Sequence, residues 1–175
     1  MKKFLLIFAC LIYSINTFGQ EGPTTREVMQ LTLPKGTEKL DEEKLNNLSH
    51  NRFNEKTTSD FHDHIFKKDS LLIYYMNLSF PRILRKSLES NQIMMVSLLG
   101  QAKDTVDYSK IISVNNIRFL IIEYHDKNTM YIRFRSDYDK SGSLINGFIE
   151  CKKRHERQAR HYLQDLLKGM HFKNE

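Results

Sequence analysis

The stretch from Phe61 to Phe66, FHDHIF, places two histidines one residue apart around an aspartate. If this segment is extended, His62 and His64 lie on the same face and could both bind one metal ion, whereas in a helix they would point in nearly opposite directions. A zinc site needs at least a third protein ligand, which the sequence does not identify. Lys67 and Lys68 follow at once and would repel a cation. We therefore expect exposed imidazoles at the junction of a loop and a strand, with a metal site at His62 and His64 as the alternative.

A second group of candidate residues lies in MYIRFRS, in which polar and apolar side chains alternate. In a strand, Tyr131, Arg133 and Arg135 share one face. Two guanidinium groups beside a phenol could bind a carboxylate, phosphate or sulfate through paired hydrogen bonds. The alternative, which we favour, is that the arginines pair with Glu123 or Glu150, acids of the neighbouring expected strands. The three residues are the candidate ligand-binding site of this sequence.

Basic residues concentrate at the C-terminal end. The formal net charge is +6, and between Lys152 and Glu175 seven Lys and Arg side chains oppose three acids. This density of cations suggests an anionic partner, although a solvated helix face is the simpler interpretation and the one we expect. The segment lacks both a DNA-binding motif and the interleaved aromatic residues of single-strand binders, so no nucleic-acid partner is expected.

The motifs of the common enzyme classes are absent from the sequence. It holds no Gly-x-Ser-x-Gly elbow, no phosphate-binding glycine loop, no dinucleotide fingerprint and no His-Glu-x-x-His pair. Glu123 is the one carboxylate that stands in an apolar run, and we expect it to pair with Arg133 or Arg118. Cys151 ends an expected strand, and no nucleophile signature surrounds it. The sequence thus predicts a protein that is not an enzyme and that needs no cofactor.

The N-terminus has the three regions of an export signal. Two lysines lead into the apolar run from Phe4 to Ile15, and the small residues Thr17 and Gly19 precede a cleavage site expected after Gly19. The run is too short for a membrane anchor, which needs about 20 apolar residues. Lipid attachment at Cys10 is disfavoured, because the bulky Phe8 precedes it and apolar residues follow. We expect a secreted or periplasmic protein whose mature chain has no transmembrane span.

Residues 1–19 are thus an expected signal peptide, and residues 20–175 an expected single domain, since no repeat or low-complexity tract interrupts them. Residues 119–122 are apolar on both faces, which indicates a central strand. The pattern predicts an α+β fold, an antiparallel sheet of five to six strands flanked by helices on both faces. Strands are expected at 28–33, 69–80, 108–114, 117–124, 129–136, 143–151 and 170–172, and helices from Asp41 onward, over 81–100 and over 152–168.

The order of these elements resembles the PsbP-like fold. A strand ending in LPKG, a capped helix, a middle helix, a meander through NNIRFLIIEY and a last helix running into LLKGMHF carry the likeness over most of the mature chain. Photosystem PsbP, a Ran-binding import factor and many small exported bacterial proteins share that fold. The resemblance implies an α/β/α sandwich that serves as a binding or assembly module, and it carries over no functional residue.

These observations predict a secreted or periplasmic, non-enzymatic module that binds a protein or an anionic envelope component. Two alternatives remain open. One is a metal-binding protein or metal-dependent enzyme that uses His62 and His64, and the other is a toxin-neutralising interaction protein. The oligomeric state cannot be predicted from these patterns.

Overall fold

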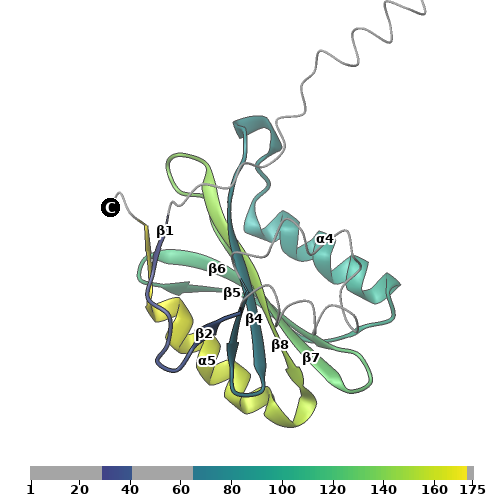
Figure 1. Cartoon of the computed structure of the whole chain (residues 1–175). Coiled ribbons are helices and arrows are strands. Elements are labelled where there is room, and N and C mark those ends of the chain that lie inside the picture. Colours follow the sequence, from purple (N-terminus) through teal and green to yellow (C-terminus); the bar gives the residue numbers. More distant parts are fainter. Residues whose placement is uncertain (1–28, 41–64, 173–175) are drawn as a thin grey trace, which may run out of the picture.

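The computed structural model describes residues 29–40 and 65–172, which contain a seven-stranded antiparallel sheet. The strand order is β2-β3-β4-β8-β7-β6-β5, and a separate two-stranded sheet pairs β1 with β9 (Figure 1). The strands are β1 (Met29–Leu31), β2 (Glu38–Lys39), β3 (Ile65–Lys68), β4 (Leu71–Ser79), β5 (Thr105–Val114), β6 (Ile117–His125), β7 (Thr129–Ser136), β8 (Ser143–Lys152) and β9 (Met170–Phe172).

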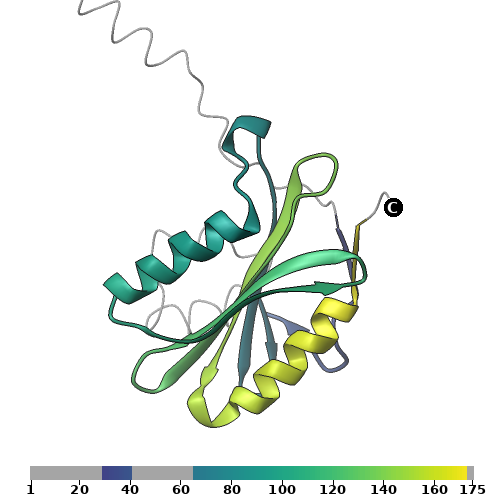
Figure 2. The ribbon, with the colours of Figure 1, turned by 180° about the vertical axis from the view of Figure 1, so that it is seen from behind.

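Two α-helices of the described chain, α4 (Leu88–Gln101) and α5 (Glu156–Lys168), cover opposite faces of the sheet (Figures 1 and 2). The alternation of β6 shows this division, since Phe119 clusters with α5 residues, whereas Leu120 and Ile122 cluster with residues of α4. Both sets are buried, which confirms the central strand predicted at 119–122. Two short 3-10 helices, η2 (Arg82–Leu84) and η3 (Lys153–His155), precede α4 and α5.

The main core lies between the sheet and α5. One side of β7 points into it, and an amphipathic stripe of α5 closes it from outside, as the helical spacing predicts. The buried residues are Met130, Ile132 and Phe134 of β7, and Ala159, Tyr162, Leu163, Leu166 and Leu167 of α5.

Two residues with positive φ form the tight turn between β5 and β6. Asn115 and Asn116, with φ of 50° and 61°, join β5 to β6, and asparagine is well suited to a two-residue turn of this kind. The predicted NN turn is therefore confirmed. The side chain of Asn115 also donates a hydrogen bond to the carbonyl of Lys168 over 2.9 Å, which ties this turn to the end of α5.

Two details differ from the prediction. The sheet has seven strands instead of five or six, because the short strands β2 and β3 extend it beyond the edge of β4. Pro81 does not open an α-helix but precedes η2. The helix starts after Ser87, whose side chain accepts a hydrogen bond from the backbone nitrogen of Ser90 over 3.1 Å. Serine is a strong N-cap, so the local capping residue sets the start of α4.

Several predicted features lie outside the described residues: the signal peptide at 1–19, the helix from Asp41, and the pair His62 and His64. None of the helices within the described ranges is both long and apolar enough to span a membrane. Residues 29–40 and 65–172 contain no group of three His, Cys, Asp or Glu side chains that could hold a metal ion.

Candidate functional site

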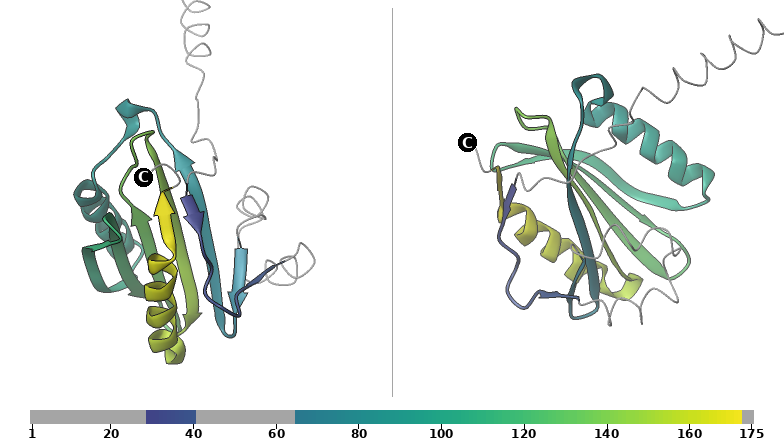
Figure 3. Two further views of the ribbon diagram at one scale, coloured as in Figure 1. Left: turned by 90° about the vertical axis from the view of Figure 1, so that its left-hand side faces the viewer. Right: turned by 45° about the horizontal axis from the view of Figure 1, so that its top comes forward.

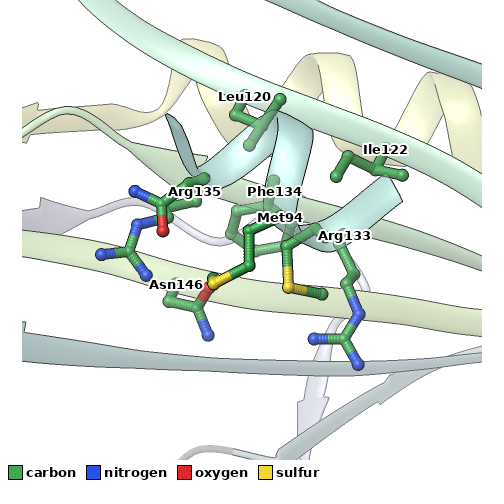
Figure 4. Close-up of a pocket in the computed structure, with 9 residues that line it drawn as sticks. Met94, Leu120, Ile122, Arg133, Phe134, Arg135 and Asn146 are labelled. Carbon is green, nitrogen blue, oxygen red and sulfur yellow. The ribbon is translucent and has the colours of Figure 1, made fainter. Parts of the chain in front are cut away.

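A small pocket of about 60 Å³ lies between α4 and the strands β6, β7 and β8. The guanidinium groups of Arg133 and Arg135 reach it from β7 and lie on either side of the Asn146 side chain, with the thioether of Met94 nearby (Figure 4). The volume accommodates a few water molecules or one small oxyanion. The lining residues are Asn91, Met94, Met95, Leu120, Ile122, Arg133, Phe134, Arg135 and Asn146.

Arg133 is held in place by an aromatic pair. Its Nε donates a hydrogen bond to the hydroxyl of Tyr124 over 3.1 Å, and its guanidinium carbon lies 5.7 Å from the centre of the same ring. Tyr124 in turn stacks on Tyr131, with ring centres 5.0 Å apart. A cation over an aromatic face is electrostatically favourable. Within the described residues, Nε is the one nitrogen of Arg133 that forms a hydrogen bond.

Arg135 lies between two aromatic rings. Its guanidinium carbon is 5.8 Å from the ring centre of Phe80 and 5.9 Å from that of Tyr138, and its Nη2 donates a hydrogen bond to the Tyr138 hydroxyl over 3.2 Å. Its Nε is buried and has no hydrogen-bond partner in the described part of the chain. A buried donor left unsatisfied costs about 1–3 kcal/mol, and a bound acceptor would relieve that cost.

Glu123, one of the two acids expected to pair with these arginines, is engaged elsewhere. Glu123 lies on the opposite face of β6, where Nε and Nη2 of Arg160 donate to its Oε2 over 2.9 and 2.7 Å. The predicted pairing of Glu123 with Arg133 or Arg118 is therefore wrong, because alternation along β6 turns this carboxylate toward α5. Within the described residues, neither Arg133 nor Arg135 forms an ion pair.

Tyr131, the third candidate residue on this face, does not line the pocket. Its hydroxyl lies 3.5 Å from Oδ2 of Asp126, near the turn between β6 and β7. Burial, together with the negative charges of Glu150 and Asp126, raises the pKa of Tyr131 to about 12, so the phenol stays neutral at physiological pH. The structure places Tyr131 behind Tyr124, where it supports the ring that holds Arg133.

Other parts of the pocket were not identified from the sequence. On one face of β8, Asn146 lies between the apolar residues Leu144 and Phe148. This polar residue in an apolar row is the feature of the sequence from which Asn146 could have been identified. Its position beside Arg135 depends on the register of β7 and β8, which the sequence does not show. Met94 and Met95 reach the pocket only because α4 crosses this face.

The basic C-terminal residues lie at the other end of β8. Lys152, Arg154 and His155, together with Lys67, border a groove of about 300 Å³ that also contains two acidic side chains. Arg160, from the same basic run, is occupied by Glu123. The run therefore does not form one continuous cationic face.

Cys151 lies in the same groove but is buried. Burial, with smaller contributions from the charges of Glu150 and Glu156, raises the pKa of its thiol to about 11. The thiol is therefore protonated near neutral pH and is a poor nucleophile, in line with the structural role expected for it.

Comparisons with known proteins identify the fold. No protein-family model matches the chain, and no curated protein matches its sequence. The solution structure of CyanoP, the cyanobacterial PsbP of Synechocystis sp. PCC 6803, is similar with a TM-score of 0.51 and 10% identity, over 89% of this chain and 99% of that one. The crystal structure of LpqN, involved in cell envelope biogenesis of Mycobacterium tuberculosis, is similar with a TM-score of 0.53 and 8% identity, over 87% and 86%. The chain has a PsbP-like fold, as the order of its elements predicts.

Proposed function

We propose that the mature protein is an exported, non-enzymatic binding module that holds an anionic group of an envelope component between α4 and β7. One observation carries the proposal. Arg133 and Arg135 are fixed by aromatic rings, border the same pocket and have no carboxylate partner among the described residues.

The donors around the pocket suit an oxyanion. Carboxylates and phosphates accept paired hydrogen bonds from guanidinium groups, and the amide of Asn146 adds a further donor beside them. A hydrogen bond to a charged group contributes about 1.5–3 kcal/mol. Leu120, Ile122 and the methionines of α4 make the rest of the lining apolar, so the preferred ligand carries its charged group next to an apolar part.

The pocket chemistry supports binding rather than turnover. Its lining consists of arginine, asparagine and apolar residues, with no histidine, acid, lysine, serine or cysteine among the described residues. An arginine stays protonated at any physiological pH, so it binds charge but does not exchange protons. The residue types that most often act as general acid, general base or nucleophile are thus missing from this lining.

Two further points support a role in the cell envelope. The N-terminal residues have the order of an export signal, with two lysines, an apolar run and small residues before the expected cleavage site. LpqN, which has a similar fold, is involved in cell envelope biogenesis.

The proposal is tested by nuclear magnetic resonance of the arginine Nε–Hε groups in the exported protein. Inorganic phosphate, acetate and a short-chain phosphatidic acid are the probes. We expect the signals of Arg133 and Arg135 to shift and saturate, and the variant R133Q/R135Q to lose binding of the same probe. The exposed Arg157 of α5 gives a matched control, R157Q, which should bind normally. If no probe shifts the two signals, or if R157Q weakens binding as much, the proposed site is wrong.

A further inference from the structure

The segment Pro81 to Lys86, which we call the tip, exposes two aliphatic side chains to solvent. Ile83 is 91% exposed and Leu84 55% exposed, and within the described residues Ile83 is the most exposed large apolar side chain. The tip contains η2 and connects β4 to α4. It projects beyond the end of the sheet, as the short coil at the top of Figure 1 and of the left panel of Figure 3. Adjacent aliphatic residues at a protruding point indicate an interaction site more than a packing position.

The tip is fixed to the body of the protein. Nε of Arg85 donates to the carbonyl of Phe80 and its Nη2 to the carbonyl of Ser141, both over 3.1 Å. Its guanidinium also lies over the ring of Tyr138, at 5.8 Å. The backbone nitrogen of Lys86 donates to the Tyr138 hydroxyl over 3.3 Å. Ile83 and Leu84 are thus presented on a braced turn, so binding through them requires little additional ordering of the chain.

Positive charge surrounds the two apolar side chains. The tip carries Arg82, Arg85 and Lys86 and no acid, and the exposed Lys140 lies in the adjacent turn between β7 and β8. The same turn carries two acids: Asp137, which pairs with Arg118, and Asp139, which accepts hydrogen bonds from Ser141 and Ser143. The four cations of the tip and the turn outnumber these two acids, so the net charge next to Ile83 and Leu84 is positive, which matches an anionic surface.

We propose that the tip docks on an anionic lipid bilayer, with Ile83 and Leu84 inserted at the boundary of head groups and acyl chains and with Arg82 and Lys86 at the phosphates. Apolar area buried in the interface and electrostatic attraction to anionic lipids are the two contributions that bind peripheral segments of this kind. A protein partner fits less well, because two side chains form only a small part of a specific interface of about 1,200–2,000 Å². This contact is separate from the ligand pocket and does not depend on it.

Co-sedimentation of the exported protein with large unilamellar vesicles tests the proposal. One set consists of phosphatidylcholine and the other of equal amounts of phosphatidylcholine and phosphatidylglycerol. We expect binding to the anionic vesicles, little binding to the neutral ones and weaker binding at high salt. The variant I83S should lower the partition coefficient about tenfold or more, and R82Q/K86Q several-fold.

The matched control is I93S on α4, since Ile93 is 74% exposed but lies outside the tip. It should bind anionic vesicles as the unchanged protein does. The idea is overturned if the protein does not bind anionic vesicles, if I83S binds as well as the unchanged protein, or if I93S loses binding equally. R133Q, which leaves Arg135 and its contacts with Phe80 and Tyr138 unchanged, should retain vesicle binding, so failure of the pocket proposal and failure of the tip proposal give different results.

Discussion

The ion pair between Glu123 and Arg160 joins the sheet to α5. We predict that loss of Arg160 destabilises the fold more than loss of Glu123 does. The Glu123 side chain is 9% exposed and that of Arg160 is 44% exposed. Removal of Arg160 leaves a nearly buried carboxylate without its two charge-assisted hydrogen bonds. Removal of Glu123 leaves an arginine that can turn to water and keep its contact with Glu156, at 3.2 Å.

These exposures set the expected magnitudes. Loss of one partner of a fully buried pair costs about 3–5 kcal/mol. Since Arg160 is partly solvated, R160L should lower the free energy of unfolding by a smaller amount, about 2 kcal/mol. The variant E123L should lose less than about 1 kcal/mol, and the double variant should be close to neutral, because apolar residues often replace a buried pair without loss. The resulting coupling energy is about 2–3 kcal/mol in magnitude.

Urea denaturation of the four proteins measures this cycle. The matched control is R157L, which changes an exposed arginine on the same helix and should shift the free energy of unfolding by less than about 0.5 kcal/mol. The reasoning is refuted if R160L is no more destabilising than R157L, or if the two changes at Glu123 and Arg160 are additive.

Two further predictions concern the core. A methyl group at Gly147 would collide with the carbonyl oxygen of Tyr74 and the ring of Phe134. In urea denaturation, G147A should therefore lower the free energy of unfolding by at least about 2 kcal/mol. The control G100A places its methyl group in open space on α4 and should be neutral or slightly stabilising. Cys151 should react slowly with iodoacetamide in the native protein and quickly in urea. Folding raises the pKa of Cys151 from 9.0 to about 11, so protonation of the thiol stabilises the folded state. This contribution to the free energy of unfolding should be lost as the pH rises from about 9 through 11. The variant C151V, which has no thiol, should not show this loss.

Local patterns predict those elements whose periodicity is strong. The strict alternation of β7 and the apolar stripe of α5 are found where the sequence places them. The start of α4 is a weaker case, because Pro81 and Ser87 are both good residues for a helix start and only the path of the chain after β4 decides between them. The short strands β2 and β3 are even weaker, since strands of two and four residues have too little pattern to separate them from loops.

The candidate site depends on register, which the sequence does not contain. Alternation alone places Arg133 and Arg135 on one face, and the structure confirms that much. The expected ion pairs, however, require an acid directly across on a neighbouring strand. The actual neighbours of Arg133 are Ile122 and Phe148, and those of Arg135 are Leu120 and Asn146. Both arginines therefore lie directly across from apolar or neutral residues, and the acid of β8, Glu150, lies across from Tyr131 instead.

The position of Arg133 and Arg135 on an apolar face does not favour stability. The same face carries Leu120 and Ile122, so leucines in place of Arg133 and Arg135 would pack on them and remove two partly buried charges. A protein selected only for stability has no reason to keep the arginines there, whereas one that binds an anion does. The residues that enclose Arg135, Phe80 and Tyr138, also anchor the tip through Arg85. The pocket and the tip thus share one cluster at the same end of the sheet.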